Sequence, residues 1–262
     1  MTSVMFAGDI PRFSPTPGIS KLSEGVDELL RIIGDRDLEG IRGPLERGAR
    51  EGGIHSSLAI EGNTRDILTV GDLIDGRPVD GPLDEIVEVG NAVAAYGRIG
   101  TVDVHSLDDL PSVHDDLMFG LVEREGFRDH GVGVYGGDRV LYRAPSHELV
   151  PELMRGLFGW FDGTGPGPCV SAAIMHYYIE KIHPFPDGNG RIGRLWHTAV
   201  LSDHDPVFCT VPLERGFLLR RDDYYGALEG PFEGHDPTGF VELSLEITRD
   251  SLADLLGAID RA

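Results

Sequence analysis

The stretch from residue 170 to residue 194 constrains the fold most, because a helical pattern runs directly into a glycine-rich turn. Before the turn, apolar side chains recur three and four residues apart, which is the spacing of a helix and not of a strand. These apolar positions are Val170, Ala173, Ile174, Tyr177, Tyr178 and Ile182. The helix is expected to end near Ile182, because Pro184 disfavours helical backbone at the residue before it. A new helix is expected to begin near Arg191.

The glycines of this turn imitate a dinucleotide-binding fingerprint. Gly188, Gly190 and Gly193 spell G-x-G-x-x-G, but a Rossmann turn follows a strand inside a βαβ unit. Here a helical pattern precedes the turn, and no parallel-sheet pattern surrounds it. A kinase loop needs a following valine and a strand lysine, and a P-loop needs Gly-Lys-Ser/Thr. The turn is therefore expected to hold phosphates in another way.

The turn brings together the groups that phosphate chemistry requires. Backbone N–H groups at the start of the second helix form a natural anion site. Around them lie a base and a carboxylate, a carboxamide, and two guanidinium groups three residues apart on one helix face. These residues are His183, Asp187, Asn189, Arg191 and Arg194. The combination indicates phosphoryl or nucleotidyl transfer.

The remainder of the chain is predominantly helical by pattern. Helical spacing is found in residues 21–33, 83–99, 147–161, 170–182 and 192–201, in residues 106–120 after the N-cap candidate Ser106, in a short helix within 63–83, and in two segments of 222–259. Residues 132–143 carry β-branched and aromatic side chains around a Gly-Gly turn, which predicts a β-hairpin. Residues 1–20 are rich in Pro, Gly and Ser and are expected to be extended. The predicted fold class is all-α with one small hairpin.

Charge and cysteine content exclude several kinds of partner. The chain has 44 acidic and 23 basic residues, a formal net charge of −21. Such a surface repels nucleic acid and anionic membranes, so neither is expected as a partner. Cys169 and Cys209 lack the spacing of a zinc site, and a reduced cytoplasmic setting is the default expectation. We find no signal-peptide pattern and no apolar run of the roughly 18 residues that span a membrane.

The segment HPFPDGNGRIGR, residues 183–194, resembles the signature of Fic proteins, H-P-F-x-[D/E]-G-N-G-R-x-x-R, at every defined position. The resemblance extends over residues 84–250. It implies a Fic fold, which is a helical bundle with a small β-hairpin flap. We expect residues 1–100 to form an N-terminal helical region and residues 101–262 to hold the catalytic core and C-terminal helices. Most characterised Fic proteins transfer AMP from ATP to a hydroxyl on a target protein.

The resemblance implies a base and a metal ligand in the motif. His183 would be the general base that deprotonates the target hydroxyl. An ordinary imidazole, with a pKa of about 6.5, is largely neutral at pH 7. Asp187 would hold Mg²⁺ bridging the α- and β-phosphates, because Mg²⁺ prefers few carboxylates plus phosphate oxygens. An Asx turn opening the glycine loop is compatible with that role.

The resemblance also implies a set of ATP-phosphate ligands. Gly188 and Gly190 would let the backbone approach the phosphates. Asn189 would bond the α-phosphate region or shape the loop. Arg191 and Arg194 would bind the β- and γ-phosphates, since arginine is a planar clamp for such groups.

For other residues, a functional and a structural role are both open. The hairpin of residues 132–143 resembles the Fic flap, which aligns a target segment by adding a strand beside it; a stabilising hairpin without a partner is the alternative. Tyr224 and Tyr225 could border the adenine, with helix packing as an equal interpretation. His176 is expected to be structural, and Gly193 receives no chemical role.

The segment SLAIEGN, residues 57–63, resembles the inhibitory motif of the family, [S/T]-x-x-x-E-[G/N]. This resemblance implies an inhibitory helix at about residues 56–63, N-terminal to the core. Its Glu61 would pair with Arg194, block the γ-phosphate position and leave the α-phosphate misplaced for attack. In some relatives the same glutamate also supports the removal of AMP.

The expected function is therefore that of a protein adenylyltransferase that uses Mg²⁺ and ATP and is autoinhibited by Glu61. De-AMPylation or another phosphate-group transfer on the same fold is the alternative, and a non-catalytic binding module is a second one. The target protein and its acceptor hydroxyl stay open, with self-modification among the outcomes. The oligomeric state is also open, although homodimers are a tendency of the family.

Overall fold

The computed structural model describes residues 13–123, 126–136, 139–162, 165–229 and 236–262. Within these ranges the protein consists of eleven α-helices, two 3-10 helices and one pair of short strands. The all-α class predicted from the helical periodicity is confirmed. No helix among the described residues is long and apolar enough to cross a membrane.

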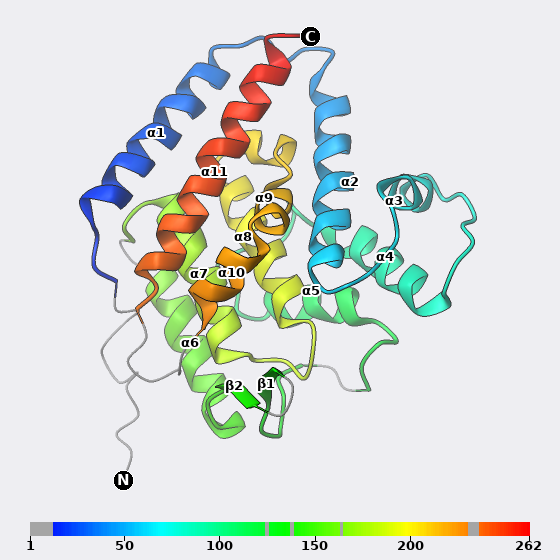
Figure 1. The fold of residues 1–262 in the computed structure, drawn as a ribbon, viewed down its shortest axis with the longest axis vertical. Helices are drawn as coiled ribbons and strands as arrows, with labels where there is room; N and C mark the ends of the chain where they lie inside the picture. The colour runs from blue at the N-terminus through cyan, green and yellow to red at the C-terminus, as the bar shows by residue number, and fades with distance from the viewer. Residues whose placement is uncertain (1–12, 124–125, 137–138, 163–164, 230–235) are drawn as a thin grey trace.

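Helices α7 (Pro168–Ile182) and α8 (Asn189–His204) form the centre of the molecule and pack against each other (Figure 1). Nearly every side chain of both helices is buried. The helix α6 (Val150–Phe161), preceded by the 3-10 turn η1 (His147–Leu149), packs on α7. The motif loop, which we define as residues 183–188, joins the two central helices and is held by them.

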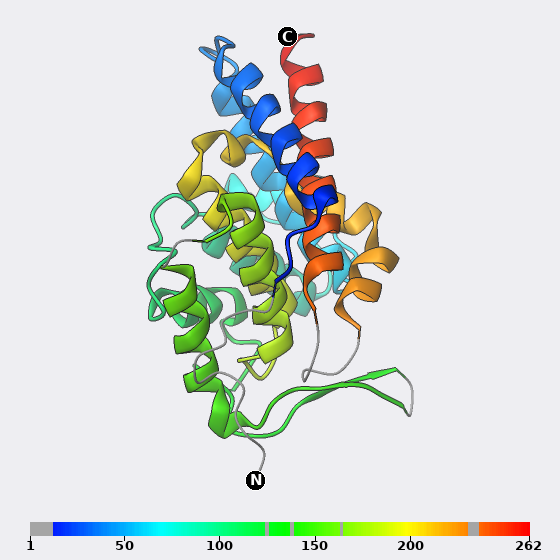
Figure 2. The same cartoon turned by 90° about the vertical axis from the view of Figure 1, so that its left-hand side faces the viewer.

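The other helices pack around this centre and on one another. The first and last helices, α1 (Pro17–Gly34) and α11 (Thr238–Ile259), lie side by side in both views (Figures 1 and 2). Helix α2 (Arg42–Ile60) packs against η2 (Pro206–Thr210), α9 (Leu213–Leu219) and α4 (Leu83–Tyr96). Helix α3 (Ile67–Ile74) packs on α2 and α4, α5 (Asp109–Met118) packs on α4 and α8, and α10 (Arg221–Leu228) packs on α11.

The strands β1 (Gly133–Gly136) and β2 (Arg139–Arg143) pair antiparallel, with Gly133 opposite Arg143. The register shifts between Val134 and Tyr135. Figure 2 shows this pair extending away from the helical body. The central residues of the turn, 137–138, lie outside the described residues.

Three expected boundaries were wrong. The expected arm of residues 1–20 already contains the start of α1, because the Thr16 hydroxyl caps the helix by accepting from the Ile19 N–H at 3.1 Å; residues 1–12 lie outside the described part. Helix α5 begins at Asp109, although the Ser106 hydroxyl does accept its N–H at 3.2 Å. The expected helix of residues 56–63 is the end of the longer α2, and Glu61 lies just beyond its last residue.

Candidate active site

The motif loop owes its shape to two left-handed residues and one buried amide. His183 ends α7 with a φ of 52°, and Gly188 precedes α8 with a φ of 76°. Phe185, which lies between them, is held by the side chain of Asn189. The Asn189 Oδ1 accepts from the Phe185 N–H at 2.9 Å, and its Nδ2 donates to the Phe185 carbonyl at 3.0 Å. Phe185 is fully buried and stacks on the ring of His114. These contacts favour the loop-shaping interpretation of Asn189.

The imidazole of His183 is prepared to accept a proton. Its Nδ1 lies 3.3 Å from the Glu180 carbonyl oxygen, a contact that assigns the N–H to Nδ1 and leaves Nε2 as the acceptor. Burial lowers the pKa of His183, and the nearby Arg128 guanidinium lowers it further, while the Glu180 carbonyl opposes both effects. The ring is therefore neutral at pH 7.

Asp187 is the exposed carboxylate of the loop, with 69% of its side chain accessible. Its Oδ1 accepts from the Gly188 N–H at 2.6 Å, one residue on and not two as in the expected Asx turn, and its Oδ2 lies 3.5 Å from Arg191 Nη2. The described residues contain no cluster of three or more potential metal-ligating side chains. One accessible carboxylate beside an anion site fits a Mg²⁺ ion that takes its other ligands from phosphate and water.

The two arginines of α8 are held to different degrees. Arg191 is buried but loosely paired, since its nearest carboxylate oxygens, from Glu88 and Asp187, lie at 3.4 and 3.5 Å. Arg194 is 1% exposed and is tightly held by the end of α2. Its Nε and Nη2 donate to the hydroxyl and the carbonyl of Ser57, both at 3.1 Å, and Nη2 also donates to Glu61 Oε1 at 2.7 Å.

Three charged side chains converge over Gly190. A Cβ atom at this position would lie 2.7 Å from Glu61 Oε1, 3.0 Å from Arg194 Nη1 and 3.2 Å from Glu180 Oε1. A side chain at this position would displace these groups, the Glu61 carboxylate first. Glu180 was not singled out in the sequence, although it shares one face of α7 with His176 and His183 by its spacing. Burial raises the pKa of its carboxyl, against the opposing effect of Arg194.

A buried polar network extends behind Arg194. The Tyr224 hydroxyl donates to Glu180 Oε1 at 2.8 Å and accepts from Arg194 Nη1 at 3.3 Å. It also lies 3.1 Å from Nε2 of His176, which is fully buried, as expected for a structural histidine. A Cβ on Gly193 would lie 2.9 Å from His176 Cδ2, so this glycine has a packing role that the sequence did not reveal.

The two neighbouring tyrosines of α10 differ in environment. Tyr224 is fully buried, so the helix-packing interpretation holds for it and the adenine-bordering one does not. Tyr225 is 40% exposed, and the Arg221 guanidinium lies 5.6 Å from the centre of its ring.

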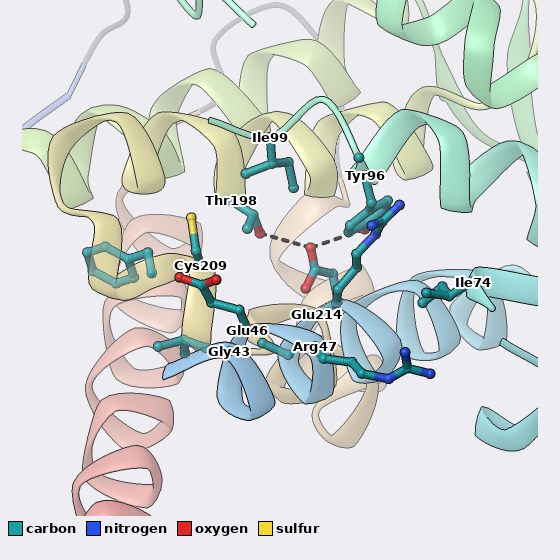
Figure 3. A pocket seen from close by; sticks show the side chains of 14 residues that line it. Gly43, Glu46, Arg47, Ile74, Tyr96, Ile99, Thr198, Cys209 and Glu214 are labelled. Carbon is teal, nitrogen blue, oxygen red and sulfur yellow. Dashed lines mark hydrogen bonds between the residues drawn. The ribbon is translucent and has the colours of Figure 1, made fainter. Parts of the chain in front are cut away.

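A separate cavity of about 460 Å³ lies along α2, away from the motif loop (Figure 3). Its wall includes the buried carboxyl of Glu214, whose Oε1 accepts from the Thr198 hydroxyl at 2.8 Å and from the Tyr96 hydroxyl at 3.1 Å. Burial raises the pKa of Glu214. None of the motif residues lines this cavity.

Comparison with known proteins identifies the family. The Fic/DOC family model matches residues 104–201. A solved structure of a Fic family protein from Desulfovibrio desulfuricans G20 is 36% identical, superposes with a TM-score of 0.87, and is covered over 77% of its length by 95% of this chain. This chain belongs to the Fic family. The resemblance seen in residues 183–194 is thus confirmed.

Further relatives extend the similarity beyond the motif. "Protein adenylyltransferase Fic" of Culex quinquefasciatus is 29% identical over 212 residues, which are 76% of this chain and 40% of that protein. "Protein adenylyltransferase fic-1" of Caenorhabditis elegans is 28% identical over 220 residues, which are 79% of this chain and 41% of that protein. A solved structure of Fic-1 shares the fold, with a TM-score of 0.75. The chain spans about two fifths of the length of these curated relatives.

Proposed function

We propose that this Fic protein is a protein adenylyltransferase that transfers AMP from ATP to a hydroxyl of a target protein. The observation that carries the proposal is the arrangement of the motif loop. A neutral His183 stands at its start, the free N–H groups of the first turn of α8 stand at its end, and Arg191 and Arg194 follow on α8. A base, an anion site and two guanidinium groups along one loop suit attack on a bound triphosphate.

In the proposed reaction, Nε2 of His183 takes the proton of the target hydroxyl as its oxygen attacks the α-phosphorus of ATP. The bond between the α-phosphorus and its bridging oxygen breaks, and pyrophosphate leaves. The α8 N–H groups and the two arginines hold the phosphates in line for this attack. Asp187 would hold Mg²⁺, which when bound neutralises charge on the phosphates.

We further propose that Glu61 inhibits this reaction. Its carboxylate occupies the Arg194 guanidinium at 2.7 Å and is partly exposed, so it also repels an incoming triphosphate. In this proposal residues 1–100 supply the inhibitory segment, residues 101–262 supply the catalytic core, and the β1–β2 hairpin aligns the target by strand addition.

Labelled ATP tests the proposed chemistry. The wild type, Glu61→Gly and Glu61→Gly/His183→Ala proteins are incubated with Mg²⁺ and either α- or γ-labelled ATP, alone and with a cell extract. We expect label in protein only from the α position, more in Glu61→Gly than in wild type, and none without His183. Intact mass spectrometry identifies a single added AMP.

Each alternative has its own outcome in this experiment. Label in protein from the γ position would indicate kinase chemistry instead of adenylyl transfer. Loss of AMP from previously modified protein, dependent on Glu61, would indicate de-AMPylation. ATP bound by Glu61→Gly without any label in protein would favour a binding module.

A further inference from the structure

We propose that Arg128 is a positioning residue that couples the seating of the β1–β2 hairpin to the geometry of His183. The inference rests on the proposed function of His183 as the base and of the hairpin as the target-aligning element. It assigns a role to a residue that lies outside the signature motif, 55 positions before His183.

The Arg128 side chain is 3% exposed, and its guanidinium donates to four backbone carbonyls. Nε donates to the His183 carbonyl at 2.7 Å, and Nη2 reaches the Ile182 carbonyl at 3.4 Å. Nη1 donates to the His130 carbonyl at 2.8 Å, and Nη2 also donates to the Pro145 carbonyl at 2.6 Å.

These four carbonyls belong to two different parts of the fold. His130 precedes β1 and Pro145 follows β2, so the guanidinium contacts both ends of the hairpin. The two ends are also joined to each other, because the Ala144 N–H donates to the Val132 carbonyl at 3.3 Å. The other two carbonyls form the end of α7. One planar group therefore joins the base of the hairpin to the start of the motif loop.

Arg128 contacts His183 where the backbone has an unusual conformation. His183 is the only non-glycine among the described residues with a positive φ, at 52°, a conformation that residues with a side chain rarely adopt. Arg128 holds this segment twice, because its backbone N–H also donates to the Pro184 carbonyl at 2.9 Å. The direction of the imidazole depends on this backbone, since its Nδ1 is aligned on the Glu180 carbonyl.

A hairpin displaced from its seat would remove the His130 and Pro145 carbonyls from the guanidinium. Arg128 would then be a buried cation without two of its carbonyl acceptors, which is costly, so it would shift and release the His183 carbonyl as well. A target strand that seats the hairpin firmly would have the opposite effect. Target docking and alignment of the base are in this way linked through one side chain.

The test compares Arg128→Lys with Arg128→Gln in the Glu61→Gly background. Lysine keeps the positive charge but lacks the planar set of five donors, and glutamine lacks both. Neither variant can therefore donate to all four carbonyls. We expect AMP transfer to fall by on the order of 10- to 100-fold in both, as for a misplaced reacting group. The affinity for ATP, measured by calorimetric titration, is expected to stay that of the parent.

The pH profile separates positioning from charge. The charged groups acting on His183 are Arg128, Asp187 and Glu61, of which Glu61 is absent from this background. Loss of the Arg128 charge raises the pKa of His183, so the acidic limb of the rate profile is expected at higher pH in Arg128→Gln. In Arg128→Lys the limb is expected to stay in place while the maximal rate is low.

Hydrogen exchange provides a readout that does not depend on activity. In Arg128→Lys, faster amide exchange is expected both in residues 139–143 and in the motif loop. The control is Arg155→Lys, on the exposed face of α6, which is expected to behave as the parent in every measurement.

Parent-level transfer with an unchanged pH profile in Arg128→Lys, or faster exchange confined to the hairpin, would overturn the proposal. An inactive Glu61→Gly parent would instead count against the proposed function and leave the exchange experiment decisive for Arg128.

Discussion

The hydroxyl of Tyr224 lies within hydrogen-bonding distance of three groups from α7 and α8, of which Arg194 and His176 are buried and Glu180 is half-buried. It accepts from Arg194 Nη1, donates to Glu180 Oε1 and faces His176 Nε2. Its single proton is committed to the carboxylate, so the two nitrogens must both donate to its oxygen. The neutral His176, whose pKa is lowered by burial, therefore carries its proton on Nε2.

The variant Tyr224→Phe removes this hydroxyl from its three partners, two of which are buried. We expect the free energy of unfolding to fall by about 1–3 kcal/mol, the usual cost of buried groups left without a partner. In the Glu61→Gly background we also expect a higher KM for ATP, because Arg194 loses its alignment. Urea denaturation and initial rates at varied ATP measure the two effects.

Tyr225→Phe is the matched control for this experiment. Tyr225 is the next residue on α10, is 40% exposed, and is expected to tolerate the change within about 0.5 kcal/mol. Equal losses of stability in the two variants would mean that the hydrogen bonds of the Tyr224 hydroxyl do not stabilise the protein.

At the residue scale, the sequence predicted the residues of the motif but not the residues that hold them in place. His183, Asp187 and both arginines could be selected because their types and spacing suit phosphate chemistry. Glu180 and Arg128 could not, because a single acid or arginine acquires its role only from partners distant in the chain. Tyr224 was noticed, but its burial depends on how α10 packs, which local sequence does not determine.

At the scale of elements, α2, α4, α8 and α9 meet around the carboxyl of Glu214 beside the cavity of Figure 3. Burial raises the folded-state pKa of this group above its ordinary value of 4.5. The folded protein thus binds the Glu214 proton more tightly than the unfolded chain does. The stabilisation is fully present below pH 4.5 and is lost as the pH rises through the folded-state pKa.

The variant Glu214→Gln keeps an oxygen for the Tyr96 and Thr198 hydroxyls but cannot ionise. Relative to wild type, we expect its free energy of unfolding to improve between pH 4.5 and pH 8, by about 1.4 kcal/mol for each unit of the pKa shift. Urea denaturation at the two pH values measures this difference. Glu46→Gln, a partly exposed acid that lines the same cavity, is the control. A constant difference between Glu214→Gln and wild type at both pH values would contradict the argument.

The positions of several long helices, including the central pair α7 and α8, followed from apolar periodicity, but the pattern did not predict α2 before residue 56. The short elements η2 and α9 were not predicted, since five and seven residues are too few to establish a period. The end of α2 was misjudged for a related reason. Glu61 and Gly62 leave the helix there, and the resemblance in residues 57–63 fixes the motif but not the length of the helix that precedes it.

At the scale of the whole molecule, the first and last helices, α1 and α11, are packed together. Ile19, Val26 and Ile33 of α1 are buried in the same core as α11. Helix α2 likewise packs on η2 and α9 from the C-terminal half. The proposed division at residue 100 therefore separates roles, while the packing joins the two parts. We infer that the inhibitory segment and the core unfold together.

The two tryptophans of the chain, Trp160 and Trp196, make this inference measurable, because both lie in the C-terminal part. The substitution Ile33→Ala opens a cavity in α1, where the side chain is 1% exposed, and is expected to cost about 2–5 kcal/mol. If the molecule is one cooperative unit, tryptophan fluorescence and far-ultraviolet circular dichroism will both move to a lower urea midpoint by the same amount. The exposed Lys21→Ala on the same helix is the control. A fluorescence midpoint that stays in place while the dichroism transition splits would show instead that the catalytic core folds without α1, and that the N-terminal helices can detach as a body from the site they are proposed to inhibit.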